Sequence, residues 1–521
     1  MDDASHKESD TPNIKHINMD STKGALKNNG ALTENSDGAN EQRHRSRALC
    51  DACIPSKLFN KLLMICCLTE ATRVKIRIIV MSLSFMAEFT AYLSLQNLQS
   101  SLNASGGLGT MSLSMLGFGL AIASWFSHIP IRFFGPKLCI IVGWMSMCVF
   151  IIANAFPYPY TLIPASVLVG LTMGPTWTAQ GMFMTTYSIE YAELVNMEEG
   201  DAMGYFSGIF FGIFHTSRII GDLISSLVLQ TPLESLDRNR TLDGITCGSE
   251  FCPSDLDRVN ASALNPPSSE QIERLVGIYL GFGILGVLIA IFCLADGTLK
   301  ETVKEGVCKN AFSAIAITGN IKFLLILPVL VFVGLKQSLM AGDFTQAYVS
   351  CELGIGWVGF TMLGLSLSNT VFAYITGRLQ KFIGAVSMAT VGFIIDLIVL
   401  LGMLLWHPSR SNIWLFFLWP AIRGIADAIW DNAMNTALGV CFVDQQDTAF
   451  AARGAWFGVG YAIAFALTNI LCMDIKIFIN FAALVVSTAS IFTLYGLMKW
   501  KWSNNVDISK QNSREEVGTQ L

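Results

Sequence analysis

Charged residues are scarce in this chain of 521 residues, where Asp, Glu, Lys and Arg together make up only 14%. A soluble domain carries about a quarter of such residues, so the scarcity excludes an ordinary water-soluble domain. A strong positive charge is also lacking: the formal net charge is −5, and the one basic run, Arg43 to Arg47, is short. Nucleic-acid binding is therefore not expected.

Motifs of enzyme chemistry are absent as well. The sequence contains no P-loop, no GxSxG, no HExxH and no paired CxxC motif. Its six histidines do not stand at the spacing of metal ligands. We therefore expect a protein that is not an enzyme and that holds no metal and no cofactor.

Long apolar runs are what the chain has instead: 52% of its residues are hydrophobic, and its mean hydropathy is +0.50. A helix needs about 20 apolar residues to cross a hydrocarbon core about 30 Å thick. About twelve such stretches occur, near 76–98, 111–128, 138–156, 161–187, 203–229, 275–295, 322–342, 355–376, 384–405, 413–437, 453–472 and 477–498. Because each must satisfy its own backbone hydrogen bonds in lipid, the sequence predicts an all-α polytopic membrane protein.

One phrase occurs twice. AEFTAYLS (87–94) lies in the first span, and GDFTQAYVS (342–350) ends the seventh. The loops after spans two and eight, IRFFGPK and GRLQKFIG, also correspond in position. This repetition predicts two six-helix halves, the architecture of major facilitator proteins, with a cavity at their interface.

Lysines and arginines set the expected orientation, because short cytoplasmic loops carry an excess of both. They gather before span one, in the loops after even-numbered spans and after span twelve, so both termini are expected in the cytoplasm. The predicted regions are a disordered N-terminal tail (1–56), a juxtamembrane segment (57–74), a first half (75–295) with an extracellular loop (230–274), a cytoplasmic linker (296–320), a second half (321–498) and a C-terminal tail (499–521).

The expected outer loops carry two further features. All three Asn-x-Ser/Thr sequons, at Asn103, Asn239 and Asn260, fall there, so N-glycosylation is predicted at each. Cys247 and Cys252 lie in the long outer loop, five residues apart, and are predicted to form a disulfide with each other. The other cysteines are interpreted as small core residues.

Ionisable residues inside the spans form the candidate site. A charge at mid-bilayer costs about 2.5–3.5 kcal/mol, so each must face protein or water. The candidates are Glu88, Arg218, Asp222, Asp343, Arg423, Asp427 and Asp431, accompanied by Lys336 and Asp396. Spacing along one helix predicts the pairs Arg218–Asp222, Arg423–Asp427 and Lys336–Asp343.

Two interpretations of these charges remain open. In the first, they serve as internal salt bridges and as residues reaching the membrane interface. In the second, Glu88 and Asp343, one in each half, line a cavity and bind a cation or a proton, with Asp427 the best-placed residue of all. Asp396, alone in an apolar span, is expected to make a helix–helix hydrogen bond. Pro175 breaks the ladder of span four, either as a hinge or as a fixed kink.

An ordered set of motifs carries a family resemblance. It includes YTLIPASVLVGLTMGPTWTAQ (160–180), YFSGIFFGIFHTS (205–217), YVSCELGIGWVGF (348–360), GIADAIWDNAMNTALGV (424–440) and TAFAARGAWFGVGYAIAF (448–465). Over residues 75–498 the chain resembles the Unc-ninety-three-like (uncoordinated-ninety-three) family of the major facilitator superfamily, and most nearly its A-type homologues. The resemblance implies a plasma-membrane protein that regulates two-pore-domain potassium channels.

Three functions are therefore compatible with the sequence. The resemblance favours an accessory subunit that modulates a potassium channel within the lipid bilayer. The acidic residues of the spans would also suit a secondary transporter of a small cation or solute. A B-type branch of the same family implies a third role, the trafficking escort of another membrane protein.

Overall fold

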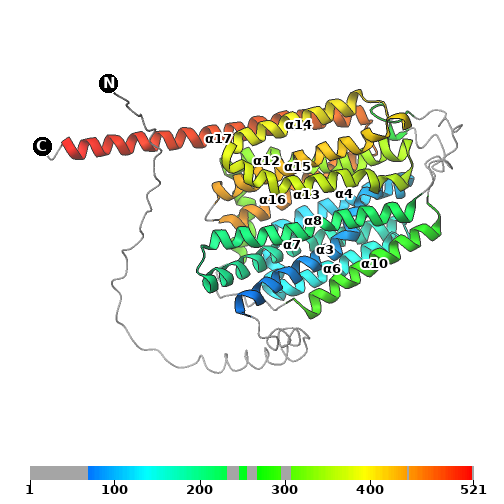
Figure 1. The fold of residues 1–521 in the computed structure, drawn as a ribbon, viewed down its shortest axis with the longest axis horizontal. Helices are drawn as coiled ribbons and strands as arrows, with labels where there is room; N and C mark the ends of the chain where they lie inside the picture. The colour runs from blue at the N-terminus through cyan, green and yellow to red at the C-terminus, as the bar shows by residue number, and fades with distance from the viewer. Residues whose placement is uncertain (1–68, 231–245, 255–266, 295–306, 443–444, 519–521) are drawn as a thin grey trace, which may run out of the picture. The chain divides into compact units, whose positions relative to one another are not determined.

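The computed structural model describes residues 69–230, 246–254, 267–294, 307–442 and 445–518. Every regular element in these ranges is a helix, and Figure 1 shows the long helices running alongside one another. In the first half they are α3 (Glu70–Leu102), α4 (Leu108–Trp125), α6 (Pro136–Ala153), α7 (Pro159–Val195), α8 (Glu199–Leu229) and α10 (Ser269–Phe292). In the second half they are α12 (Ile321–Ser338) with its π-helical continuation η6 (Leu339–Ser350), α13 (Val358–Ile383), α14 (Ala385–Leu405), α15 (Ile413–Cys441), α16 (Gln446–Leu467) and α17 (Met473–Gly518).

Local sequence signals mark where several helices begin. Thr69 caps α3 by accepting the backbone N–H of Thr72 at 3.3 Å. Ser268 and Gln271 form a capping box, in which each side chain satisfies a backbone N–H of the other, at the start of α10. This cap ends the outer loop at Ser268, earlier than the predicted boundary at residue 274.

Eleven of the described helices are long and apolar enough to cross a membrane. The remaining long helix, α8, has 31 residues but is not among the eleven. Its charged residues, Glu199, Asp201, Arg218 and Asp222, explain this, since each lowers the mean hydropathy of the helix. The all-helical, polytopic fold class is confirmed, and α8 is the least apolar of the long helices of the bundle.

Each half packs mainly within itself. In the first half α3 packs against α8 and α10, and α7 against α4 and α6, whereas in the second half α15 packs against α13 and α14, and α12 against α16 and α17. The most extensive contacts between the halves are those of α4 with α16, α8 with α13, and α3 with η6. The predicted interface between two six-helix halves is therefore present.

Glycines let helices of the two halves approach closely. A Cβ atom on Gly117 of α4 would lie 2.9 Å from the backbone nitrogen of Ala462, and one on Gly458 of α16 would lie 2.8 Å from that of Ala121. Small residues have this role in membrane proteins, where helices gain no hydrophobic energy from leaving lipid and rely on close packing. Larger residues at either position would push α4 and α16 apart.

The expected extracellular end of the interface is closed. Ser100 and Ser101 of α3 form hydrogen bonds with Thr345 and Ser350 of η6, at 3.1 and 2.7 Å. Every residue of η6 is buried. Hydroxyl groups of the two halves thus bond directly to each other at this end.

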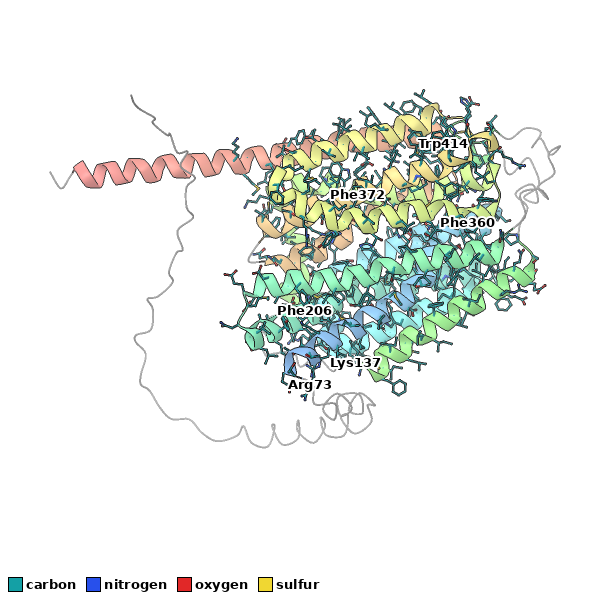
Figure 2. All side chains as sticks on the ribbon, viewed as in Figure 1. Arg73, Lys137, Phe206, Phe360, Phe372 and Trp414 are labelled. Carbon is teal, nitrogen blue, oxygen red and sulfur yellow. A yellow bond between two sulfur atoms is a disulfide. The ribbon has the colours of Figure 1, made fainter. Side chains whose placement is uncertain are left out.

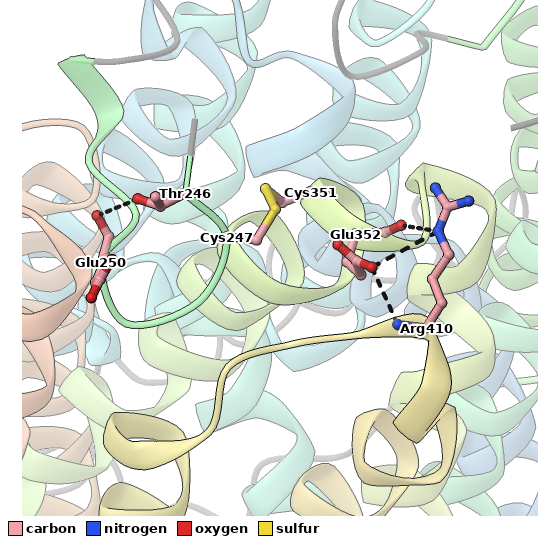
Figure 3. The surroundings of a disulfide bond; sticks show 6 residues. All are labelled: Thr246, Cys247, Glu250, Cys351, Glu352 and Arg410. Atoms are coloured by element: carbon pink, nitrogen blue, oxygen red, sulfur yellow. Dashed lines mark hydrogen bonds and ion pairs between the residues drawn. A yellow bond between two sulfur atoms is a disulfide. The ribbon is translucent and has the colours of Figure 1, made fainter. Parts of the chain in front are cut away.

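A short stretch of the long outer loop, residues 246–254, docks on the second half. Cys247 is bonded to Cys351, and Cys252 to Cys472 (Figure 3 shows the first of these bonds). The backbone adds two hydrogen bonds of 2.9 Å, from Gly248 N to Ala347 O and from Met473 N to Phe251 O. We call this stretch the outer segment.

The predicted Cys247–Cys252 disulfide is therefore wrong. Gly248, which follows Cys247, has a φ of +96°, a conformation that glycine adopts without strain. Each sulfur reaches a helix end of the second half instead. The prediction failed because Cys351 and Cys472 lie at the edges of apolar spans and were interpreted as core residues.

Two regions predicted as a linker and a tail are also helical. The linker expected at 296–320 contains α11 (Val307–Ala316), and α17 continues through Gly518 rather than ending at the tail predicted for 499–521. No proline or glycine occurs between residues 499 and 517, so the sequence offers no helix breaker there. The tail 1–56 and most of the segment 57–74 lie outside the described residues.

Apolar side chains project outward from the bundle, notably along α10 and α14 (Figure 2). Leu285 and Leu288 of α10 are 47% and 44% exposed, and Ile398 and Leu401 of α14 are 48% and 44% exposed. Surfaces of this kind are suited to lipid tails.

Candidate functional site

The candidate site is built on α15, where charged residues recur every fourth position. Arg423, Asp427 and Asp431 therefore share one helix face. Arg423 Nε lies 3.2 Å from Asp427 Oδ1, so these two residues pair within α15 as predicted. This face points toward charged residues of neighbouring helices. We call these three residues, together with Lys336 of α12 and Asp396 of α14, the interior cluster.

Lys336 of α12 joins the cluster. Its Nζ lies 2.7 Å from Asp427 Oδ1, and its side chain is only 4% exposed. The predicted pairing of Lys336 with Asp343 is therefore wrong. The two residues are seven apart, but the ion pair with α15 is available because α12 and α15 pack against each other.

Asp396 of α14 is also paired. Its two oxygens accept hydrogen bonds from Arg423 Nη1 and Trp430 Nε1, each at 2.7 Å. The side chains of Asp396 and Arg423 are 0% and 1% exposed. The expected helix–helix hydrogen bond is confirmed by Trp430, and the ion pair with Arg423 adds to it.

Asp343 is held by a cation that sequence reasoning missed. Lys476 Nζ lies 2.7 Å from Asp343 Oδ1 and donates a second hydrogen bond to the Thr468 carbonyl at 2.9 Å. In the predicted topology Lys476 lies in the short outer loop between the spans 453–472 and 477–498. The closeness of Lys476 to the outer end of span seven was the signal that could have identified the pair.

Glu88 lies elsewhere. It is 0% exposed, has no ion pair within the described residues, and has the Cys148 sulfur 3.9 Å from Oε1 as its hydrogen-bond partner. Its other oxygen has no hydrogen-bond partner and lies against Gly286 of α10. Glu88 therefore faces α6 and α10, and Asp343 faces α17, so the structure does not bring these two carboxylates to a shared site.

Arg218 and Asp222 of α8 lie across the interface from α15. They do not form the predicted ion pair; instead Asp222 accepts hydrogen bonds from Asn97 at 3.0 Å and from Ser366 at 2.9 Å. Asp222 is thereby satisfied by one helix of each half. Arg218 has neither an ion pair nor a hydrogen bond within the described part of the chain.

Asp431 is the accessible member of the cluster. Its nearest cation is Arg453 of α16, with 4.0 Å between Asp431 Oδ1 and Arg453 Nη2. The two side chains are 48% and 31% exposed, although both residues stand well inside their helices. Protein atoms therefore do not cover this pair.

The remaining predicted positions are outside the cluster. Pro175 lies within α7, where Gly174 packs so closely that an added Cβ would be 2.7 Å from the Ala123 backbone; its role as a hinge stays a prediction. Asn103 is only 6% exposed, and its amide donates to Gln99 and Asn154 at 2.8 and 3.1 Å. A glycan on Asn103 would have to replace both bonds, so the structure argues against glycosylation there. The sequons at Asn239 and Asn260 lie outside the described residues.

Compensation of charge is the common property of the interior. Besides Glu88, each interior carboxylate described above has a cation within 4.0 Å or, for Asp222, two hydrogen-bond donors. Once Lys476 and Arg453 are counted, five cations stand against six interior carboxylates, so most of the excess of acid inferred from the sequence is compensated. Within the described ranges there is also no group of three His, Cys, Asp or Glu side chains that could hold a metal ion.

Solved structures show the fold. The crystal structure of the nucleoside transporter NupG superposes with a TM-score of 0.54 at 13% sequence identity, over 80% of this chain and 98% of that chain. The likeness confirms the major facilitator architecture of two six-helix halves.

Relatives align with about four-fifths of this chain. "Protein unc-93 homolog A" of Xenopus laevis is 32% identical over 431 residues, 81% of this chain and 92% of the relative. The human homolog A is 31% identical, over 82% of this chain and 94% of its own length. The "putative potassium channel regulatory protein unc-93" of Caenorhabditis elegans is 29% identical, over 78% of this chain and 59% of its own length.

The family model described as "Ion channel regulatory protein UNC-93" matches residues 103–492, which span α4 through almost all of the membrane-crossing part of α17. This range includes every member of the interior cluster and both disulfides. The chain belongs to the UNC-93 family of ion channel regulatory proteins.

Proposed function

We propose that the chain is an accessory subunit that regulates a potassium channel, of the two-pore-domain class. Membership of the UNC-93 family carries the proposal, together with the name of the Caenorhabditis elegans relative. The charge pairing inside the bundle also supports the proposal. Interior carboxylates other than Glu88 are compensated by lysine, arginine or hydrogen bonds, and hydroxyl groups of the two halves bond to each other at the outer end; both features disfavour conduction of a cation by the chain itself.

An accessory role places function on the outward faces of the bundle. α10 and α14 present rows of exposed apolar side chains, and a channel helix can pack against such a face in lipid. Neither the relatives nor the solved neighbour bear the name of an enzyme, and we infer no catalytic activity.

Whole-cell recording tests the proposal. Cells expressing the chain alone should show no new current, whereas coexpression with a two-pore-domain potassium channel should change the channel current at constant channel surface amount. Leu285→Trp on α10 and Leu401→Trp on α14 form a matched pair on separate lipid faces; we expect one to abolish modulation while Asp431→Asn retains it. A current from the chain alone would contradict the proposal, and a change in channel surface amount alone would indicate an escort.

We further infer a plasma-membrane location with both termini in the cytoplasm. The lysine and arginine excess of the expected inner loops supports this orientation, as do the two disulfides, which favour an oxidising exterior. Epitope tags at either end should bind antibody only after cells are permeabilised. Staining of intact cells would reverse the orientation.

A further inference from the structure

Asp222 of α8 is a buried acid at the boundary between the two halves. Its side chain is 0% exposed, and it forms no ion pair within the described residues. One oxygen accepts a hydrogen bond from Asn97 Nδ2 of the first half at 3.0 Å, and the other accepts one from Ser366 Oγ of the second half at 2.9 Å. A single acidic group thus bonds to both halves, and both of its donors are neutral.

The two halves are in direct contact around this group. A Cβ atom added to Gly359 of α13 would overlap with the backbone oxygen of Asp222, so α8 and α13 meet backbone to backbone. Asn97 and Ser366 are 3% and 2% exposed, so the whole contact is covered by protein. Water can therefore reach the Asp222 carboxyl group only when α8 and α13 move apart.

The surroundings of Asp222 favour its neutral form. The side chains that face this region from α3, α10 and α13 are uncharged: Asn97, Tyr279 and Ser366. On α8 itself, the titratable residues of the two preceding turns are His215 and Arg218. Arg218 would favour the ionised form, but it is partly exposed and forms no ion pair with Asp222. A carboxylate buried without a cation is costly, so the closed contact favours a protonated Asp222.

The protonated form also keeps both hydrogen bonds. Asn97 donates to one oxygen as before. The carboxyl O–H can donate to Ser366 Oγ, because the Ser366 hydroxyl has a second acceptor in the Met362 carbonyl oxygen, 3.1 Å away. The contact can therefore hold a proton without leaving a buried polar group unsatisfied.

No other side-chain bond between the halves can respond to pH in this way. The remaining ones in the described residues join hydroxyl, amide and backbone groups: Ser100 with Thr345, Ser101 with Ser350, Ser114 with the Ala462 carbonyl, and Asn469 with Thr110 and the Gly107 carbonyl. Asp222 is the only acidic or basic side chain among them. Glu88 is as deeply buried, but it lies within the first half, against α6 and α10.

We propose that Asp222 is a proton-binding site that couples protonation to the contact between the halves. The halves close on a neutral Asp222. When α8 separates from α13, the carboxyl group is exposed to water, gives up its proton to it and becomes a carboxylate. Because the closed state then holds one proton more than the open state, acid favours closure and alkali favours opening. The ratio of open to closed molecules should rise by up to about tenfold per pH unit.

The test measures the separation of the halves in purified full-length protein. Spin labels on Tyr160→Cys of α7 and Trp414→Cys of α15 mark the expected outer end of each half, since these side chains are 74% and 59% exposed. Distances between the labels are recorded from about pH 5 to about pH 9, a range that brackets the change expected of a buried acid. The longer distance should gain population as the pH rises. A distance distribution that does not change with pH would overturn the proposal.

Variants assign the change to Asp222. Asp222→Asn should remove the pH dependence and keep the halves closed, because an amide stays neutral. Ser366→Ala keeps the acid but removes its partner in the second half, so it should open about threefold to tenfold more at a given pH and remain pH-dependent. Glu88→Gln and His215→Gln are the matched controls and should titrate as the parent does. An Asp222→Asn variant that still opens with rising pH would contradict the proposal.

Infrared spectroscopy gives a second readout that does not depend on opening. The C=O absorption of a protonated carboxyl group is distinct from that of a carboxylate. Asp222→Asn should therefore remove part of the protonated-carboxyl absorption that the parent shows at about pH 7. An unchanged absorption would mean that Asp222 is ionised in the closed state, which would also overturn the proposal. Both measurements are made without a channel, so their results are independent of channel regulation.

Discussion

Two carboxylates at matching positions of the two halves have different surroundings. Glu88 in Glu-Phe-Thr and Asp343 in Asp-Phe-Thr occupy matching places in the repeated phrase, and both are buried, at 0% and 4% exposure. Asp343 has Lys476 at 2.7 Å, whereas Glu88 has only the Cys148 sulfur at 3.9 Å. A buried carboxylate without a cation is costly, so the Glu88 site accommodates the neutral form of the side chain. The first half thus holds a carboxyl group without a charged partner where the second holds an ion pair.

The helices that carry these residues also differ. The first copy reads Phe-Thr-Ala-Tyr and the second Phe-Thr-Gln-Ala-Tyr, so Gln346 is one extra residue. α3 remains α-helical through its copy, whereas the second copy lies in the π-helix η6. A π-helix accommodates one more residue per widened turn, which matches the insertion. The two disulfides also end in the second half, beside the ion pair, so its outer end is cross-linked as well as charge-paired.

Removing the cation that pairs with Asp343 in the second half should lower the free energy of unfolding most. Lys476→Met leaves Asp343 buried without a partner, and such changes cost about 3–5 kcal/mol. We expect that loss in the free energy of unfolding, measured by denaturant titration in detergent. Asp343→Asn combined with Lys476→Met should recover part of it, because the charge is then also removed. Equal stability of the single variant and the parent would contradict the pairing.

Breaking a disulfide should have the next largest effect. Cys472→Ser opens a cross-link between residues 220 apart and should lower the free energy of unfolding by about 2–4 kcal/mol. Cys252→Ser should cost the same, and the double variant no more than either single one. Cys139→Ser, at a buried free thiol, is the control for a small change in the core. Additive losses at Cys252 and Cys472 would show that they are not bonded to each other.

The sequence predicted the fold better than it predicted the partners. The apolar runs predict twelve helices, and the repeated phrase predicts two halves. Both signals can be recognised in the sequence without knowing which helices are neighbours. Partners depend on which helices are neighbours. Arg423–Asp427 was correct because the two lie on one helix, whereas Lys336, Asp343 and Asp222 each bond to another helix.

Cysteine pairing failed for a similar reason. Cys247 and Cys252 are close in sequence, and their partners are 104 and 220 residues away. The expected topology does place Cys351 and Cys472 on the same side of the membrane as the outer loop. Four cysteines on one side allow three pairings, and the sequence offers no means of choosing among them.

An exposed pair in the second half should matter far less than the buried one. Arg410 Nε lies 3.9 Å from Glu352 Oε1, and the side chains are 38% and 26% exposed (Figure 3). Burial raises the pKa of the Glu352 carboxyl, and the Arg410 backbone N–H and its charge oppose that rise. Arg410→Ala should therefore cost less than about 1 kcal/mol.

The pH dependence of that cost has a definite sign. Arg410 stabilises only the ionised carboxyl, so the cost should be present at neutral pH and disappear as the pH falls through the pKa of Glu352. Unfolding of parent and variant at pH 7 and at pH 4 measures it. A cost that grows on acidification would contradict the assignment.

The smallest effect is expected where the first half differs most from the second. Glu88→Gln keeps the shape of a neutral carboxyl and removes no ion pair, so the free energy of unfolding should change by less than about 0.5 kcal/mol. The same exchange at the matching position, Asp343→Asn, leaves Lys476 buried without its carboxylate and should be strongly destabilising. Denaturant titration of the two variants side by side compares the halves with one chemical change. A loss at Glu88 as large as that at Asp343 would mean that Glu88 is ionised and paired, and that the halves treat their carboxylates alike.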